Sequence, residues 1–172
     1  MKTNNFRINS LAIMAAVLLL ASVPGVSASG GFGSGGAAAV TNPTLLDMLT
    51  YAIQDEYAAR AEYEMIIDEY GEIRPFTNII RSEETHIGLL TPLFAQYGYP
   101  VPADTSSEHV ILPSDLRSAF EIGVEAEIAN IAMYEMFLAR ELPDDVRDVF
   151  ERLMAASESH LRAFENGLNR YR

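Results

Sequence analysis

Apolar side chains recur every three to four residues over most of the chain beyond residue 41, which is the spacing of an amphipathic α-helix. Four such segments follow one another, separated by glycine, proline or polar residues. Each has one stripe of positions predicted to face inward. The stripes contain, in chain order, Leu49, Ile53, Glu56, Ala59, Tyr63, Ile67 and Tyr70; Phe76, Ile80, Glu83, His86, Ile87, Leu90 and Leu93; Leu116, Phe120, Gly123, Glu127, Ile131, Tyr134 and Leu138; and Val146, Phe150, Leu153, Ser157, His160, Phe164 and Leu168.

The ends of the segments carry helix start and stop signals. Thr44, with Asp47 three residues later, is a variant of the capping box that begins a helix. Gly71 and Gly98 follow the last apolar positions of the first two segments and predict their ends.

The lengths of the connections predict the topology. Short links over residues 71–75 and 141–144 make each flanking pair of helices antiparallel, whereas residues 98–113 are long enough to cross the bundle. Two antiparallel hairpins joined by a longer crossover form the ferritin-like version of an all-α four-helix bundle. An α-solenoid is the alternative, but it needs at least about three repeats.

The two hairpins also repeat in sequence. Glutamate, tyrosine and methionine positions of the first segment recur in the third with a shift of 71, and phenylalanine and histidine positions of the second recur in the fourth with a shift of 74. The matching pairs are Glu56 and Glu127, Tyr63 and Tyr134, Phe76 and Phe150, and His86 and His160.

Five ionisable residues occupy inward positions near the middle of the helices: Glu56, Glu83, His86, Glu127 and His160. A carboxylate buried there must be paired, protonated or bound to a cation. Glu83 and His86 are three residues apart and share a helix face. A Glu-x-x-His pair that faces a glutamate on a neighbouring helix is the ligand arrangement of di-metal carboxylate bundles. Such ligands without sulfur suit iron, manganese or zinc.

These residues carry a resemblance to a known superfamily. The Glu56-x-x-Ala59-Arg60-x-x-Tyr63 segment, followed by Phe76 and Glu83-x-x-His86, resembles the first half of ferritin-like proteins, nearest to rubrerythrin. The phrases RPFTNIIRSEETHIGLLTPLFAQYG, GVEAEIANIAMY and AASESHLRAF are more similar to a ferritin-like domain family of unknown function. The superfamily resemblance implies a metal-binding or oxidoreductase bundle with the five residues as ligands, and the closer family implies no established activity.

One position departs from the superfamily pattern. Ser157 stands where the counterpart of Glu83 is expected, and the adjacent Glu158 is turned about 100° away on the helix. The site therefore offers three carboxylates and two imidazoles. An asymmetric metal pair or a single ion fits this set better than a symmetric di-iron centre, and complete loss of metal is left open.

The buried glutamates and histidines also allow interpretations without a metal ion. Arg60 and Arg81 are candidate partners of the buried glutamates, and a metal-free polar network through Ser157 is the main alternative to a metal. Tyr63 and Tyr134 are either core residues or hydrogen-bond donors to the ligand carboxylates.

Ionisable residues outside the inward stripes are expected to be exposed to solvent. His109 is expected in an exposed loop, and Glu62, Glu64, Asp68 and Glu69 are expected on a solvated helix face.

The N-terminal region does not have the amphipathic helix pattern of the rest of the chain. Lys2 and Arg7 precede an apolar run over residues 11–23, and small residues end at Ala28, which is the layout of a cleaved signal peptide over residues 1–28. Residues 29–40 are rich in glycine and predict a flexible leader. The bundle domain is expected over residues 41–172, in an exported protein that is secreted or periplasmic.

Net charge and the absence of cysteine exclude several classes of partner and of metal site. The 172 residues carry a net charge of −12, which becomes −14 if residues 1–28 are removed, and this argues against nucleic acid or an anionic membrane surface as a partner after signal cleavage. The chain has no cysteine, which excludes disulfides, thiolate metal sites and iron–sulfur clusters.

The sequence as a whole predicts an exported ferritin-like protein that binds iron or manganese, with oxygen- or peroxide-linked redox chemistry as its candidate activity. A metal-dependent oxidoreductase of this kind would need an external electron donor, and no catalytic residue is assigned. The alternative is a non-enzymatic exported bundle with a metal-free polar core, acting in binding or envelope structure. Iron storage would require assembly into a shell, and the sequence leaves a homo-oligomer open.

Overall fold

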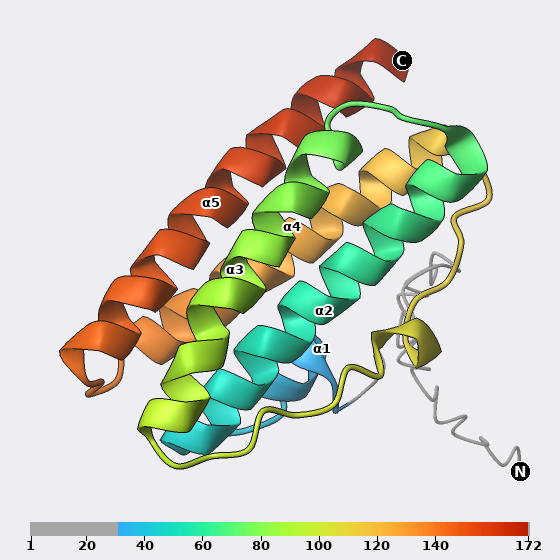
Figure 1. The fold of residues 1–172 in the computed structure, drawn as a ribbon. Coiled ribbons are helices and arrows are strands. Elements are labelled where there is room, and N and C mark those ends of the chain that lie inside the picture. The colour runs from blue at the N-terminus through green and yellow to red at the C-terminus, as the bar shows by residue number, and fades with distance from the viewer. Residues whose placement is uncertain (1–30, 172) are drawn as a thin grey trace, which may run out of the picture.

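Four long α-helices dominate the computed structural model, which describes residues 31–171 (Figure 1). The described elements are α1 (Gly33–Ala37), α2 (Leu45–Tyr70), α3 (Phe76–Gln96), η1 (Ser106–Glu108), α4 (Leu116–Leu138), α5 (Asp144–Leu168) and η2 (Asn169–Tyr171). All of these elements are helical, and the predicted all-α, ferritin-like bundle is confirmed.

The predicted topology is present. Helices α2 and α3 form one antiparallel hairpin, and α4 and α5 form the other (Figure 1). The segment between α3 and α4 runs along the bundle, so α4 begins at the end of the molecule where α3 begins. It contains η1, which contacts α2.

Local signals at the helix ends behave as the sequence indicates. The Thr44 hydroxyl accepts a hydrogen bond from the Asp47 N–H, and the Asp47 carboxylate accepts one from the Thr44 N–H, which completes a capping box at α2. Gly71 ends α2 with a φ of 89°, and Gly98 follows α3 with a φ of 73°, a region that favours glycine. Asp115 caps α4 by accepting from the Ser118 N–H.

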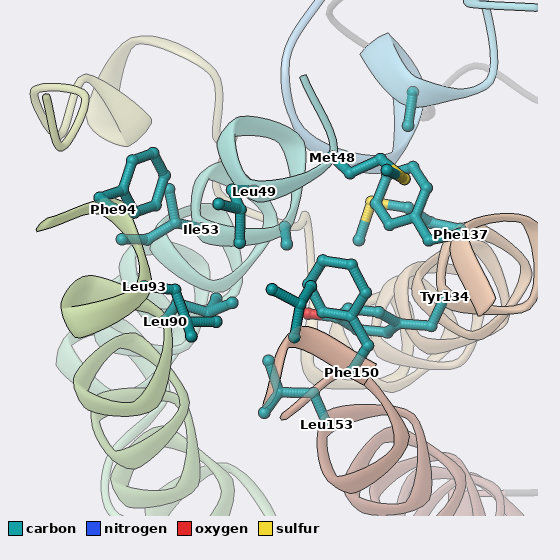
Figure 2. Packing of buried hydrophobic residues seen from close by; sticks show 14 of the residues in the cluster. Met48, Leu49, Ile53, Leu90, Leu93, Phe94, Tyr134, Phe137, Phe150 and Leu153 are labelled. Carbon is teal, nitrogen blue, oxygen red and sulfur yellow. The ribbon is translucent and has the colours of Figure 1, made fainter. Parts of the chain in front are cut away.

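The core consists of two apolar clusters with a polar layer between them. One cluster contains Ile53, Leu90, Tyr134 and Phe150 (Figure 2), and the other is built around the rings of Tyr63, Phe76, Phe120 and Phe164. On every long helix the chain passes from one cluster to the other. The buried polar residues of α3, α4 and α5 fall in the interval, and Glu56 of α2 directly precedes Tyr57, the last buried residue of the first cluster on that helix. The polar layer is thus held at one level of the bundle and shielded from water above and below.

Glycines let α4 and α5 approach closely at the end of the bundle that contains Phe120 and Phe164. A Cβ added at Gly123 would lie 2.9 Å from the Phe164 ring, and one added at Gly167 would meet the Phe120 ring. Each glycine therefore provides the room for a phenylalanine of the opposite helix.

The N-terminal segment differs from the sequence prediction. Residues 29–40 were expected to form a flexible leader, but residues 33–37 form α1, which packs against α2 and α4. The Ser34 N–H donates to Asp55 Oδ1 at 2.6 Å, and Ala37 is fully buried. A Cβ at Gly36 would lie 2.7 Å from the Tyr51 ring. Glycine is thus used here for close backbone approach, so the folded unit begins before residue 41.

The predicted signal peptide, residues 1–28, lies outside the described residues. Within residues 31–171, no helix has both the length and the apolar character that crossing a membrane requires.

The glycine contacts predict opposite effects for two alanine substitutions. Gly88→Ala, where nothing lies within 4 Å of an added Cβ on α3, should raise the free energy of unfolding by up to about 1 kcal/mol. Gly167→Ala should lower it by about 1–3 kcal/mol, because the methyl group must displace the Phe120 ring. Urea unfolding followed by far-UV circular dichroism measures both, and stabilisation by Gly167→Ala would contradict the close packing of α4 and α5.

Candidate metal centre

All four long helices contribute to the polar layer. Glu56 comes from α2, Glu83 and His86 from α3, Glu127 from α4, and His160 from α5. The five side chains predicted from the sequence are buried, with 2% to 8% of each residue exposed. The structure brings all five together at one level of the bundle.

Glu83 lies at the centre of the group. Its Oε2 atom is 2.9 Å from Nδ1 of His86, and its Oε1 atom is 3.3 Å from Nδ1 of His160. His86 Nδ1 is also 2.9 Å from Oε2 of Glu56, and His160 Nδ1 is 3.4 Å from Oε1 of Glu127. Two triads, each made of a histidine and two glutamates, therefore share the Glu83 carboxylate.

Two tyrosines connect the halves of the repeat crosswise. The Tyr134 hydroxyl on α4 donates to Glu56 Oε1 on α2 at 2.8 Å, and the Tyr63 hydroxyl on α2 donates to Glu127 Oε1 on α4 at 3.2 Å. Both tyrosines are fully buried. They are core residues that also orient the carboxylates, so the two roles considered from the sequence coexist.

The carboxylates differ in their ionisation. Burial, together with the neighbouring Glu83, raises the pKa of Glu56 to about 7. Burial also raises the pKa of Glu127, although His160 acts in the opposite direction. For Glu83 burial acts upward as well, but the imidazoles of His160 and His86 outweigh it, and the pKa of Glu83 lies below its ordinary value.

Both imidazoles are held in their protonated form by the surrounding carboxylates. Burial disfavours the charge on His86, but the contacts with Glu56 and Glu83 outweigh burial and raise the pKa of His86 to about 10. Contacts with Glu127 and Glu83 likewise outweigh burial and raise the pKa of His160 to about 9. The two imidazolium charges thus offset much of the charge of the three buried carboxylates.

The residues present fit a metal ion. In each triad the ligand atoms lie within 4.8 Å of one another, and carboxylate oxygens with imidazole nitrogens are the donors that iron and manganese accept. His160 Nδ1 is buried and makes no hydrogen bond of good geometry within the described part of the chain. His86 Nε2 lies 3.1 Å from Ser82 Oγ, a contact that orients the ring and leaves Nδ1 toward the glutamates.

The arginine alternative fails. Arg60 pairs with Asp104 of the crossover, and Arg81 is exposed on α3. Within residues 31–171, the ion pairs of Glu56, Glu83 and Glu127 are all with histidines.

Ser157 occupies the layer but hydrogen-bonds to a side chain outside the two triads. Its hydroxyl donates to Asn130 Oδ1 at 2.7 Å, and Asn130 Nδ2 donates to Asp55 Oδ2 at 2.6 Å. Asn130 stands where the shift of 71 places Ala59 in the first half. The two departures from the repeat therefore contact each other, and a longer side chain at residue 130 accompanies a shorter one at residue 157.

Sequence reasoning missed several residues beside this layer. Asn130 and Asp55 were not singled out, although Asn130 is an inward polar residue one turn after Glu127 and could have been noticed on that ground. Glu62 was expected on a solvated face but is half-buried, and burial with the nearby Asp55 and Glu127 raises its pKa to about 7. His109 was expected in an exposed loop but is half-buried and stacks on Phe32 with 4.1 Å between ring centroids.

Comparison with known proteins supports the fold. The chain is 27% identical over 133 residues to the uncharacterized protein MJ0754 of Methanocaldococcus jannaschii. The matched region covers 69% of this chain and 71% of that protein. The crystal structure of the hypothetical protein MJ0754 from Methanococcus jannaschii superimposes with a TM-score of 0.66 and 25% sequence identity, covering 77% of this chain and 85% of that chain.

A family model for rubrerythrin matches residues 47–168, which include all four long helices from the third residue of α2 onward and all five residues of the two triads. The chain therefore belongs to the rubrerythrin family of the ferritin-like superfamily.

Proposed function

We propose that this protein is an exported metalloprotein that binds iron or manganese through Glu56, Glu83, His86, Glu127 and His160. The observation that carries the proposal is the pair of histidine–glutamate triads that share Glu83 inside the bundle. Membership of the rubrerythrin family supports iron as the first candidate. Export is supported by the signal-peptide pattern of residues 1–28.

The activity that fits this arrangement is oxygen- or peroxide-linked redox chemistry, which the bound metal would supply. The chain's own residues would hold the ion, orient its carboxylate ligands through Tyr63 and Tyr134, and exclude bulk water with the two apolar clusters. Electrons would come from an external donor, because the chain has no cysteine for a thiolate-held relay.

One specific observation favours the alternative of a metal-free bundle in binding or envelope structure. His86 Nδ1 lies 2.9 Å from both Glu56 and Glu83, so the single Nδ1–H of protonated His86 can be shared between the two carboxylates, and its positive charge compensates them without any ion. Metal content separates the two proposals.

Substitution of the triads should lower the metal content of the purified protein after incubation with Fe(II) or Mn(II). Glu127→Gln keeps the size of the side chain but removes a charged ligand, and His86→Ala removes an imidazole. Each substitution should reduce the number of metal ions bound per chain by about half or more, as measured by inductively coupled plasma mass spectrometry. Glu84→Gln, on the exposed face of α3, and His109→Ala, outside both triads, serve as matched controls.

Two results would count against the metal proposal. Less than about 0.2 metal ion per wild-type chain after reconstitution would favour the metal-free core. Equal occupancy in Glu127→Gln, His86→Ala and the controls would show that the ion binds elsewhere.

Giving the second half of the repeat the residues of the first half, alanine at position 130 and glutamate at position 157, should increase the number of metal ions bound per chain. Ser157→Glu alone would crowd Asn130, which the Ser157 hydroxyl contacts at 2.7 Å. The double variant Asn130→Ala with Ser157→Glu supplies a fourth carboxylate and removes the crowding, so it should bind more metal per chain than wild type and approach about two ions. Asn130→Ala alone is the control, and a double variant that folds but gains no metal would show that residue 157 does not reach the site.

The metal-free protein should lose stability as the pH rises. The pKa values of His86 and His160, about 10 and about 9, lie above that of unfolded histidine, so their contribution is complete below about pH 6.5 and is lost as the pH rises through 9 to 10. Glu56, with a pKa of about 7, acts in the same direction between about pH 4.5 and 7. The lowered pKa of Glu83 has the opposite sign and acts only in acid, below this range.

Urea unfolding in the presence of EDTA at about pH 6 and about pH 9 measures this dependence. The double variant His86→Gln with His160→Gln should show a flatter profile than wild type. A wild-type protein that is equally stable or more stable at the higher pH would contradict the network described for the polar layer.

A further inference from the structure

A cavity of about 480 Å³ lies outside the two triads, between α1, α2, α4 and the crossover segment that follows η1. None of the five residues of the triads lines it. Its volume lies in the range of about 300–1,000 Å³ that is usual for small-molecule sites. It opens at the surface, because Ala129 and Ala132 on its wall are solvent-exposed. We call it the alanine cavity.

Small side chains create the room. Ala58 and Ala59 of α2 and Ala126, Ala129 and Ala132 of α4 line the cavity, together with larger apolar side chains such as Ile122 and Met133. The walls that these two helices contribute are therefore largely apolar. Such walls accept a flat apolar body with little loss of side-chain freedom.

Two segments distant in sequence close one side of the alanine cavity. Phe32, before α1, stacks on His109, after η1, with their rings inclined by 24°. Ser34 of α1 is tied to Asp55 through its N–H. The N-terminal segment is therefore a fixed wall of the cavity.

The charge of the lining selects the ligand. Asp55, Glu62 and Glu125 line the cavity, and neither arginine nor lysine does so among the described residues. Asp55 already accepts hydrogen bonds from Ser34 and Asn130. Glu62 is half-buried, and no hydrogen bond or ion pair to its carboxylate is found within residues 31–171. A carboxylate without a partner on an apolar wall favours a cation and repels an anion.

We propose that the alanine cavity binds a small organic cation, with its flat apolar body between the alanines of α2 and α4 and its protonated amine paired with Glu62. The site is independent of the metal proposal, because it uses none of the triad residues.

Three naphthalene probes that share the ring and one methylene, and whose terminal groups differ in charge, test this proposal. They are 1-naphthylmethylamine, 1-naphthylmethanol and the carboxylate of 1-naphthaleneacetic acid, which are cationic, neutral and anionic at neutral pH. The chain has no tryptophan, so naphthalene fluorescence reports binding with little background from the protein. The amine should bind at least about tenfold more tightly than the acetate, as judged by the dissociation constants.

Two substitutions assign the site. Glu62→Gln keeps the shape of the wall and should remove most of the preference for the amine, while Glu64→Gln, exposed on the same helix, should not. Ala129→Phe places a ring in the cavity from an exposed position and should abolish binding of the amine. Ala95→Phe, exposed on α3 away from the cavity, is its control. Far-UV circular dichroism and urea unfolding establish that the variants are folded.

Several outcomes would overturn the proposal. These are binding of the acetate as tight as that of the amine, binding of no probe up to its solubility limit, or binding by folded Ala129→Phe equal to wild type. Sedimentation that shows a wild-type dimer and a monomeric Ala129→Phe variant would assign the cavity to an interface between two copies of the chain.

Discussion

The shared carboxylate of Glu83 is the constraint on which the arrangement of the bundle depends. One oxygen faces His86 on the same helix, and the other faces His160 on α5, so this single side chain connects the two hairpins. A buried carboxylate that loses such partners costs several kcal/mol, because it leaves water without a compensating charge. Helices α3 and α5 must therefore keep their axial register, and the crosswise hydrogen bonds of Tyr63 and Tyr134 impose the same requirement on α2 and α4.

The repeat explains the symmetry of this layer, and one paired departure explains its asymmetry. Where the first half has Ala59 and Glu83, the second half has Asn130 and Ser157. The Asn130 amide contacts the Ser157 hydroxyl and also donates to Asp55, so it fills space and satisfies polar groups where a fourth carboxylate is expected from the family pattern. The protein thus keeps the rubrerythrin architecture with a site of three carboxylates and two imidazoles, and the second half is adapted to that set as a unit.

Helix periodicity, caps and the five buried ionisable residues were predictable from the sequence, because each depends on local spacing. Glu56 and His160 stand out on an apolar stripe whatever they contact. The N-terminal segment was not predictable in this way. Gly33 and Gly36 have the composition of a flexible linker, and only the close approach of the backbone to Asp55 and Tyr51 shows their role. The half-burial of Glu62 was also hidden, because it depends on alanines from a helix distant in sequence and on the segments that close over them.

Adjacent residues of α2, about 100° apart around the helix, serve the two sites described here. Glu56 belongs to a histidine–glutamate triad, while its neighbour Asp55 lines the alanine cavity and accepts from Asn130. Asn130 in turn accepts from Ser157 in the polar layer, so a continuous chain of hydrogen bonds joins the cavity wall to the layer. Electrostatics connects them too, because Glu127 contributes to the raised pKa of Glu62. A positive charge placed beside Glu62 therefore also acts on Glu127, one carboxylate of the candidate metal centre, from the solvent-facing side of the bundle.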